Sequence, residues 1–564
     1  MKSTAAPAES LAALSKEYWE ARMSNEPLFA TAIGERRFDS KLPAISPEGR
    51  ALVREEYEAF LERGREIPEA DFSSEDRLTR TALLVDVGSA LEYYSCDLDD
   101  WVVDPLQGPQ VELMNVESYQ PVRTVAEARD MVKRWHAIGP YVDQHVANLD
   151  YGASVGKIAV SAAVEKVIDE LNDLLDKPDS EWALLRPLAV GHPEWMSEDR
   201  EEFRVGLQAA VRESARPAFA RYLGFLRSKI LPMARPQEKP GIMHVSGGAE
   251  AYARLIRVHT SLDLTPKELH EKGLFEVTRI NDELEELGGN MFGSKDRREI
   301  LRRLRTDPSL YFSNGEEVFA KAEAALARAN AVIHRWFGRL PKTSCEVVEM
   351  AEHEQKHSTI AYYRPPSMDG SRPGRYYINT SAPETRPKYE AEALAFHESV
   401  PGHHLQIAIA QELEGVPEFR KNGGVTAFVE GWGLYSERLA AEMGLYSSDM
   451  DRVGILSFDA WRACRLVVDT GMHAMGWTRE QAIDFMMENS ALAKNNIVNE
   501  VDRYITWPGQ ALAYKTGQLE MLRLRKEAEG RLGSRFDVRR FHDVLLGNGA
   551  IPLKALGQVM GSYA

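Results

Sequence analysis

Cysteine is scarce in this 564-residue chain, and its three cysteines, Cys96, Cys345 and Cys464, lie far apart. An odd number at these spacings excludes a disulfide framework and a cysteine-based zinc site, and it fits a reducing compartment. No stretch approaches the roughly 18 consecutive apolar residues of a membrane span. Residues 1–23 also lack the apolar segment of a signal peptide. We therefore expect a soluble cytoplasmic protein without a membrane partner.

Basic residues are in deficit, with 69 Lys and Arg against 86 Asp and Glu and a net charge of −17. A nucleic-acid-binding protein needs a basic surface to displace counterions from phosphates, so we expect no nucleic-acid partner. Hydrophobic residues make up 44% and charged residues 27% of the chain. This composition excludes disorder and collagen, and it is typical of a globular chain that buries a large core.

Helical periodicity dominates the sequence. In Glu316–Leu340, apolar residues recur at steps of three and four, which is typical of an amphipathic helix. Thr265, followed by Pro266 and Glu268, is typical of a helix start with a capping box. Similar patterns occupy much of the chain before residue 340. We therefore predict a mainly α-helical protein.

The clearest interruption is the Pro- and Gly-rich segment 231–250. We interpret it as a boundary between lobes or as a long ordered loop. The corresponding division is an N-terminal helical lobe, 1–240, and a catalytic helical lobe, 241–564, within one compact two-lobed unit.

Two short runs favour β-strands over helix, Cys345–Met350 and Arg375–Thr380. The segment between them that precedes the second run, 365–374, is rich in turn-forming residues. We therefore expect a small β-sheet, and its position in the chain, shortly before the histidine cluster described next, places it near the active site.

One cluster combines three histidines with a carboxylate: HESVPGHH begins at His397 and Glu398 and ends at His403 and His404. A zinc hydrolase needs two imidazoles and a carboxylate on the metal, and a further carboxylate to accept a proton from water. The common H-E-x-x-H spacing puts both histidines on one helix face. Here the position of the second histidine is taken by Pro401.

Three geometries are open for this cluster. In a regular helix, His404 returns to the face of His397, but about 10.5 Å further along the axis, an awkward reach for two Zn–N bonds of about 2.0–2.1 Å. Alternatively, Pro401 and Gly402 interrupt the helix as a two-residue insertion, and His403 returns to the metal. In the third, His403 and His404 both contribute in another way. We favour the interruption, because proline removes a backbone donor and glycine permits unusual dihedral angles.

A third ligand is expected on a following helix. In residues 428–440, Glu430 lies within an apolar stripe that includes Trp432. An unpaired charge is costly there, so a metal ion would account for it, whereas pairing with an arginine is the alternative. Glu437, seven residues later on the same face, is the second candidate for the ligand. It could also fix the tautomer of a ligand histidine.

Four strings, HESVPGHHLQ, EGWGLYSERL, WRACRLVVDTGMH and RYITWPGQALAYK, follow one another in that order. Together they resemble the bacterial domain-of-unknown-function family 885, from about residue 250 to the C-terminus and more weakly before it. That family is thought to be similar to the gluzincin metallopeptidases, which include helical zinc carboxypeptidases, thimet oligopeptidase and dipeptidyl peptidase III. Dipeptidyl peptidase III carries one extra residue before G-H, and this chain departs further, with a longer insertion.

The resemblance implies zinc bound by His397, His403 and Glu430, with Glu398 as the general base. It also implies a large, helical, cleft-type metallopeptidase-like fold with a small β-sheet. An edge strand of that sheet, which we place at Arg375–Thr380, could pair with an extended peptide.

We therefore predict a zinc-dependent metallopeptidase that cleaves short peptides as a carboxypeptidase or dipeptidase, with Glu398 moving the proton. One alternative is a zinc hydrolase of a non-peptide amide or ester, and another is a non-catalytic, metal-binding helical scaffold. Tyrosine and histidine suit an oxyanion, and arginine and lysine suit a substrate carboxylate, although a structural role is an equal alternative for each residue. The candidates are Tyr504, Tyr514 and His473 for the oxyanion, and Arg503 and Lys515 for the carboxylate.

Overall fold

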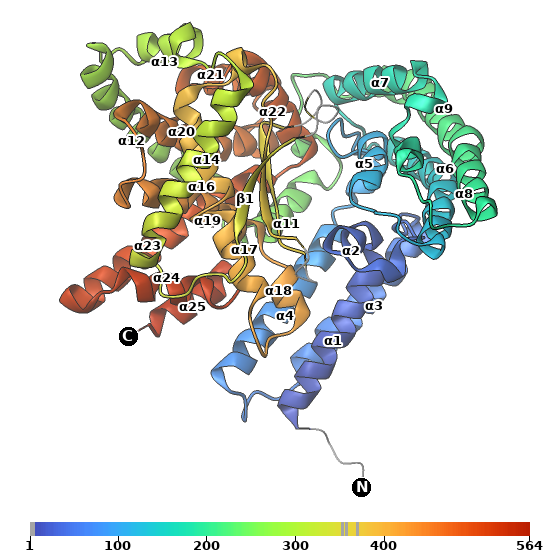
Figure 1. Ribbon diagram of the computed structural model, residues 1–564, viewed down its shortest axis with the longest axis horizontal. Coiled ribbons are helices and arrows are strands. Elements are labelled where there is room, and N and C mark those ends of the chain that lie inside the picture. The colour runs from blue at the N-terminus through green and yellow to red at the C-terminus, as the bar shows by residue number, and fades with distance from the viewer. Residues whose placement is uncertain (1–5, 351–354, 356–358, 368–371, 564) are drawn as a thin grey trace.

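The computed structural model describes residues 6–350, 355, 359–367 and 372–563, and most of them are helical, as predicted. In Figure 1, the helices of the N-terminal part, blue to blue-green, form one half of the molecule, and the helices from α11 onward form the other. The α-helices of the first half are α1 (Pro7–Asn25), α2 (Pro27–Ile33), α3 (Pro47–Glu66), α4 (Ser74–Tyr94), α5 (Pro109–Asn115), α6 (Val125–Ser154), α7 (Ser161–Asp176), α8 (Ser197–Ala209), α9 (Arg216–Phe225) and α10 (Leu231–Met233).

The second half carries the histidine cluster, and several of its helices pack around a central one, α20. The α-helices are α11 (Gly248–Thr260), α12 (Pro266–Phe292), α13 (Arg297–Thr306), α14 (Gly315–Val332), α16 (Ala391–Glu398), α17 (His403–Gln411), α18 (Glu418–Asn422), α19 (Thr426–Glu442), α20 (Asp449–Ala474), α21 (Arg479–Asn489), α22 (Lys494–Thr506), α23 (Ala513–Leu532), α24 (Val538–Leu546) and α25 (Leu553–Gly561).

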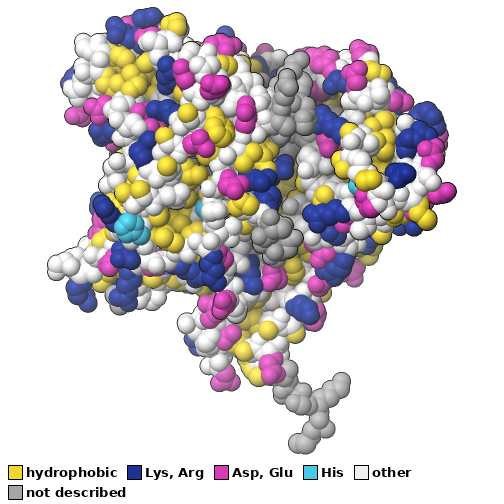
Figure 2. Space-filling model, in the orientation of Figure 1, with side chains coloured by type: hydrophobic (Ala, Val, Ile, Leu, Met, Phe, Trp, Pro, Cys, Tyr) yellow, Lys and Arg dark blue, Asp and Glu magenta, His cyan; other side chains and the backbone are white. Residues whose placement is uncertain are grey.

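Helix α20 is the central helix of this half. Nearly every residue from Val453 to His473 is buried, because α12, α16, α19, α21 and α23 all pack against it. This central helix is thus buried on all sides, and it buries charged residues such as Asp459 and Arg465 as well as apolar ones. Among the described residues, no helix combines the length and the hydropathy that crossing a bilayer requires. On the face drawn in Figure 2, basic and acidic side chains are interspersed.

The predicted capping box at Thr265 is present. The Thr265 hydroxyl accepts from the backbone N–H of Glu268 at 3.2 Å, and the Glu268 carboxylate accepts from the N–H of Thr265 at 2.8 Å. The predicted helix Glu316–Leu340 is shorter than expected, because α14 ends at Val332 and a single 3₁₀ turn follows. Beyond that turn, the N–H groups of Gly338 and Arg339 donate to Asp543 on α24, both at 2.8 Å, so a tertiary partner replaces the helical hydrogen bonds.

Both predicted strands belong to one small sheet, with bounds of β1 (Cys345–Glu349) and β3 (Gly374–Ile378). A third strand that the sequence did not reveal, β2 (Ala361–Arg364), completes it in the order β1-β3-β2. Strand β3 is parallel to β1 and antiparallel to β2. The expectation of an edge strand at Arg375–Thr380 is therefore wrong, because β3 is hydrogen-bonded on both sides. Part of the turn-rich segment 365–374, residues 368–371, lies outside the described residues.

Segment 231–250 is an ordered connection between the halves. The guanidinium of Arg235 donates to the carbonyl oxygens of Lys239, Pro240 and Gly241 at 2.7, 3.0 and 2.7 Å. One hydrophobic cluster lies within residues 28–230 and another within 312–563, but a further cluster packs Trp101 against residues beyond 241. The two halves therefore share buried apolar surface.

Helices α19 and α23 approach closely enough to exclude side chains at two glycines. A Cβ on Gly431 would lie 2.5 Å from the backbone of Gly517, and a Cβ on Gly517 would overlap the carbonyl oxygen of Ala427. Since α19 carries two of the candidate site residues, this contact sets their position.

Replacing Gly517 by Ala should lower the melting temperature, because the new methyl group forces α23 away from α19. The matched control is Gly530→Ala on the same helix, where no atom lies within 4 Å of the added Cβ. That change should leave stability unchanged or raise it by about 0.5–1 kcal/mol, the usual gain in a helix interior. Thermal unfolding followed by circular dichroism measures both, and equal effects of the two variants would contradict the role given to the contact.

Candidate functional site

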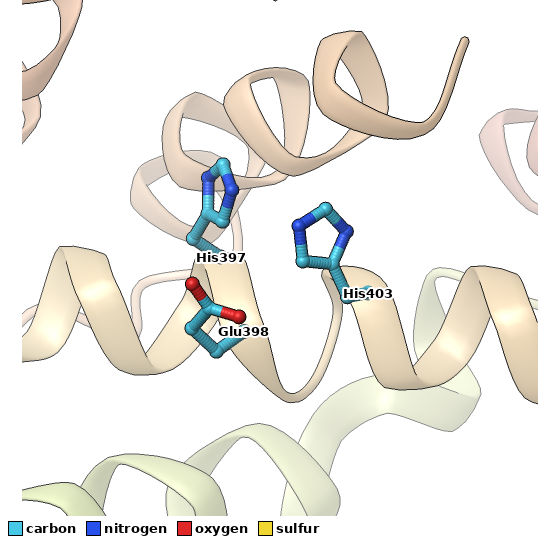
Figure 3. A group of neighbouring side chains, drawn as sticks. All are labelled: His397, Glu398 and His403. Atoms are coloured by element: carbon cyan, nitrogen blue, oxygen red, sulfur yellow. The ribbon is translucent and has the colours of Figure 1, made fainter. Parts of the chain in front are cut away.

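The histidine cluster lies where one helix stops and another starts. Helix α16 ends at Glu398, and α17 begins at His403 after a turn that contains a cis Val400–Pro401 peptide bond. A Cβ on Gly402 would overlap the carbonyl oxygen of His397, so only glycine fits there. The interruption lets both rings face one space, with centroids 4.6 Å apart and planes at 83° (Figure 3).

Helix α19 brings a carboxylate to these two rings. The Oε2 atom of Glu430 lies 3.6 Å from Nε2 of His397 and 3.7 Å from Nε2 of His403. Both distances exceed those of N–H···O hydrogen bonds. Donor atoms bonded to one tetrahedral zinc ion at about 2.0–2.1 Å lie about 3.3 Å from one another. Glu430 Oε2 thus lies from each imidazole nitrogen at about the separation of two ligands on one zinc ion, and these nitrogen and oxygen donors fit zinc.

The same helix orients His397. Oε1 of Glu437, 1% exposed, accepts from Nδ1–H of His397 at 2.8 Å, which leaves the Nε2 lone pair directed at Glu430. Gly433 makes room for the ring, since a Cβ there would lie 2.5 Å from its Cε1 atom. The indole of Trp432 donates to the carbonyl oxygens of Pro401 and Gly402 at 2.9 and 3.2 Å, which fixes the turn.

Glu398 completes the cluster. One carboxylate oxygen of Glu398 and one ring nitrogen each of His397 and His403 lie within 4.8 Å of one another. Both Glu398 and Glu430 could thus reach a cation, and Glu430 Oε2 lies within 3.7 Å of both Nε2 atoms. Glu398 is half-buried beside them (Figure 3), where it can act on a molecule held at the cation.

Burial and the close approach of carboxylates and imidazoles shift the pKa values of the cluster residues. Burial opposes protonation of His397, but the carboxylates of Glu430 and Glu437 raise its pKa to about 9. Burial lowers the pKa of His403 to about 4. Burial raises the pKa of Glu398 to about 7, whereas the two imidazoles hold the pKa of Glu430 well below its usual range. A cation would stabilise the carboxylates in their charged form.

His404 has a structural role. Its Nε2–H donates to the carbonyl oxygen of Thr343 at 3.0 Å, and the hydroxyl of Tyr363 on β2 donates to its Nδ1 at 2.9 Å. Both ring nitrogens are occupied, and the ring is directed at the sheet. Of the alternatives open from the sequence, the structure therefore places His403 at the cluster.

Two of the expected oxyanion donors, His473 and Tyr504, are hydrogen-bonded to other residues of the protein. Nδ1 of His473 accepts from the N–H of Ile242 at 3.0 Å, and its Nε2–H donates to the carbonyl oxygen of Tyr504 at 2.9 Å. The Tyr504 hydroxyl donates to Glu500 at 2.7 Å and accepts from Arg465 at 2.9 Å. The structure therefore contradicts the roles predicted for His473 and Tyr504, because their polar atoms are already bonded.

The predicted carboxylate-binding residues are also paired. Lys515 is 0% exposed and forms ion pairs with Asp459 at 2.5 Å and Glu276 at 2.9 Å. Arg503 pairs with Glu500 at 3.2 Å and donates to Gln510 at the same distance. The prediction that Lys515 binds substrate is wrong, since its ammonium group is buried among fixed partners. The guanidinium group of Arg503 is likewise engaged, by Glu500 and Gln510.

Tyr514 and two arginines that the sequence reasoning missed lie next to one another. Tyr514 is half-buried, and the guanidinium carbons of Arg465 and Arg462 lie 4.2 and 6.0 Å from its ring centroid. Burial lowers the pKa of Arg462, and the nearby carboxylates of Glu437 and Glu430 act to raise it. A signal was present in the sequence: two arginines three apart in an apolar helix violate its pattern, as Glu430 does on α19.

A cavity of about 470 Å³ lies elsewhere, between the start of α19 and the helices α1, α4 and α11. Its walls include Tyr18, Asp86, His259 and Phe419, and none of the predicted site residues lines it. The cluster is thus distinct from this cavity.

Comparison with known proteins places the chain in a family. Residues 27–560 match the family described as "Bacterial protein of unknown function (DUF885)". The chain belongs to the DUF885 family. A crystal structure of a "putative lipoprotein" from Colwellia psychrerythraea superposes on this DUF885 chain with a TM-score of 0.92 at 27% identity, covering 99% of both chains. A "putative lipoprotein of unknown function" from Shewanella oneidensis shares the fold, with a TM-score of 0.74 at 17% identity over 99% of this chain and 100% of that one. No curated protein matches.

If His403 and not His404 holds the cation, the two alanine variants should differ in zinc content. His403→Ala removes a nitrogen from the cluster and should lose most of its zinc after dialysis, whereas His404→Ala should keep it. Inductively coupled plasma mass spectrometry of the dialysed proteins gives the metal-to-protein ratio. Equal zinc loss in both variants would refute the assignment of His403.

Replacing Glu437 by Gln should weaken zinc binding by about 10–100-fold, because the amide orients and polarises His397 less well than the carboxylate. The control is Glu442→Gln on the same helix, an exposed residue paired with Arg525. Competition with a chelator of known affinity measures both. An unchanged zinc affinity in the Glu437 variant would show that this carboxylate does not support the ligand.

Proposed function

We propose that this protein is a zinc-dependent hydrolase, and specifically a metallopeptidase that cleaves short peptides. The observation that carries the proposal is that Glu430 Oε2 lies within 3.7 Å of the Nε2 atoms of both His397 and His403, with Glu398 beside the two rings. The resemblance of HESVPGHH to gluzincin motifs supports the same conclusion. A cytoplasmic location stays a prediction.

The donor set of the cluster is that of a catalytic zinc site. Two imidazoles and one carboxylate leave a fourth coordination position free, which is the composition of zinc peptidases rather than of closed structural sites. When bound, zinc would supply a water molecule of lowered pKa and polarise the scissile carbonyl. His397, held by Glu437, and His403, held by the turn at Gly402, would fix the cation in place.

Glu398 has the position of a general base. It follows His397 directly on the last turn of α16 and is half-buried beside the two imidazoles. It would accept a proton from the attacking water and deliver it to the leaving amine. Tyr514, half-buried beside Arg465, stays a candidate donor to the developing oxyanion.

The variant Glu398→Gln should bind zinc as the parent does but hydrolyse peptides about 10²–10⁴-fold more slowly, since the amide cannot accept the proton. A panel of short peptides and acylated small molecules, assayed with the zinc-loaded protein, would identify the substrate class. If the variant turns over the best substrate at the parental rate with full zinc content, Glu398 is not the base.

A further inference from the structure

One buried arginine beside the candidate site has no partner. The side chain of Arg462 on α20 is 5% exposed, and its Nε and Nη1 atoms are buried without a hydrogen bond. Within the described part of the chain, no ion pair or hydrogen bond involves its guanidinium group. Aromatic rings hold it instead, with the guanidinium carbon 4.0 Å from the ring centroid of Trp461 and 4.6 Å from that of Phe458.

The lack of a hydrogen-bond or ion-pair partner distinguishes Arg462 from other buried arginines of the protein. Other buried arginines have fixed partners: Arg465 pairs with Glu500, Arg420 with Glu75, and Arg134 donates to backbone carbonyl oxygens. A buried charge without hydrogen bonds carries a large desolvation cost. Stacked aromatic rings offset part of that cost through cation–π attraction, but they satisfy none of the five N–H donors of a guanidinium group.

The position of Arg462 relates it to the site. Helix α20 packs against both α16 and α19, the helices that carry His397, Glu398 and Glu430. Arg462 acts electrostatically on Glu398 and His403. Its guanidinium also lies 6.0 Å from the ring of Tyr514. The other cationic groups considered for a substrate, Lys515 and Arg503, are taken up by ion pairs.

An arginine in this state is suited to a carboxylate. Its N–H groups form a planar fork that matches the two oxygens of a carboxylate, and the charge-assisted hydrogen bonds are stronger in a desolvated setting. The nearby carboxylates of Glu437, Glu430 and Glu398 act on Arg462 electrostatically, but among the described residues none forms an ion pair or hydrogen bond with it. The missing partner therefore comes from outside the chain.

We propose that Arg462 binds the free carboxylate of the substrate, next to the scissile amide, so that the enzyme removes C-terminal residues. The inference rests on the proposed function and adds its exopeptidase direction. A substrate whose C-terminus is amidated leaves the guanidinium unpaired and is bound poorly. An acylated single amino acid presents the same carboxylate beside an amide and is the other source of this chemistry.

The test separates binding from turnover by using the zinc-loaded Glu398→Gln protein as the parent. Isothermal titration calorimetry measures the Kd of an N-blocked tripeptide with a free C-terminal carboxylate, of its C-terminal amide, and of an N-acetylated amino acid. The free acid should bind about 10–100-fold more tightly than the amide, the usual effect of a hydrogen-bonded charge pair. Tight binding of the acetylated amino acid alone would assign the site to acylated amino acids rather than peptides.

Adding Arg462→Met should reduce the preference for the acid over the amide to within about twofold, and Arg462→Lys should retain part of it through the remaining charge. The matched control is Arg305→Met, a half-buried arginine that donates only to backbone carbonyl oxygens of residues 487–492. It should leave the preference unchanged. Melting temperatures establish that each variant is folded.

Equal binding of acid and amide by the parent, or a preference that survives Arg462→Met, would overturn the proposal, as would binding of neither peptide. The hydrolase assignment fails separately. The protein with its natural Glu398 decides this point. If it binds the acid selectively but cleaves no substrate, Arg462 is still a carboxylate-binding residue, but the protein is not a hydrolase.

Discussion

The break in the helix between Glu398 and His403 is the constraint on which the site depends. In a continuous helix, His403 would lie on a different face from His397 and about 9 Å further along the axis, too far for one cation. The turn at Pro401 and Gly402 folds the second ring back over the first, and the absence of a side chain at Gly402 permits the close passage beside His397. The placement of the two imidazoles is therefore a property of the turn as much as of the histidines.

Helix α19 packs against this turn and contacts it and the two imidazoles through several residues. Glu430 faces both imidazoles, Trp432 bonds the carbonyl oxygens of the turn, and Gly433 accommodates the ring of His397. Glu437 fixes the tautomer of that ring. Four residues within eight positions of α19 thus contact the cluster or its turn, and the packing of α19 against α23 sets their position. A change in the packing of α19 against α23 would therefore displace Glu430 and Glu437 at the cluster.

Charge within the second half is distributed in two ways. Lys515, Asp459 and Glu276 belong to an ion-pair network, together with Arg279 and Arg438, in which each buried charge meets an opposite one. Arg462 is excluded from such a network, although it lies on the same helix as Asp459. The first arrangement stabilises the fold, whereas the second keeps a cation available beside carboxylates and imidazoles. Unpaired buried charge is costly, so its persistence points to a ligand.

The sequence by itself determined the helical class, the capping at Thr265, and the set of chemical groups at the cluster, because these follow from local periodicity and residue type. It did not determine which groups have free atoms. Lys515 and His473 look chemical in the sequence, yet distant residues occupy their polar atoms. The central place of β3 in its sheet, and the preference for His403 over its neighbour, were likewise decided only in three dimensions. Hydrogen-bond partners and strand order depend on contacts between segments far apart in the chain, which no local pattern encodes.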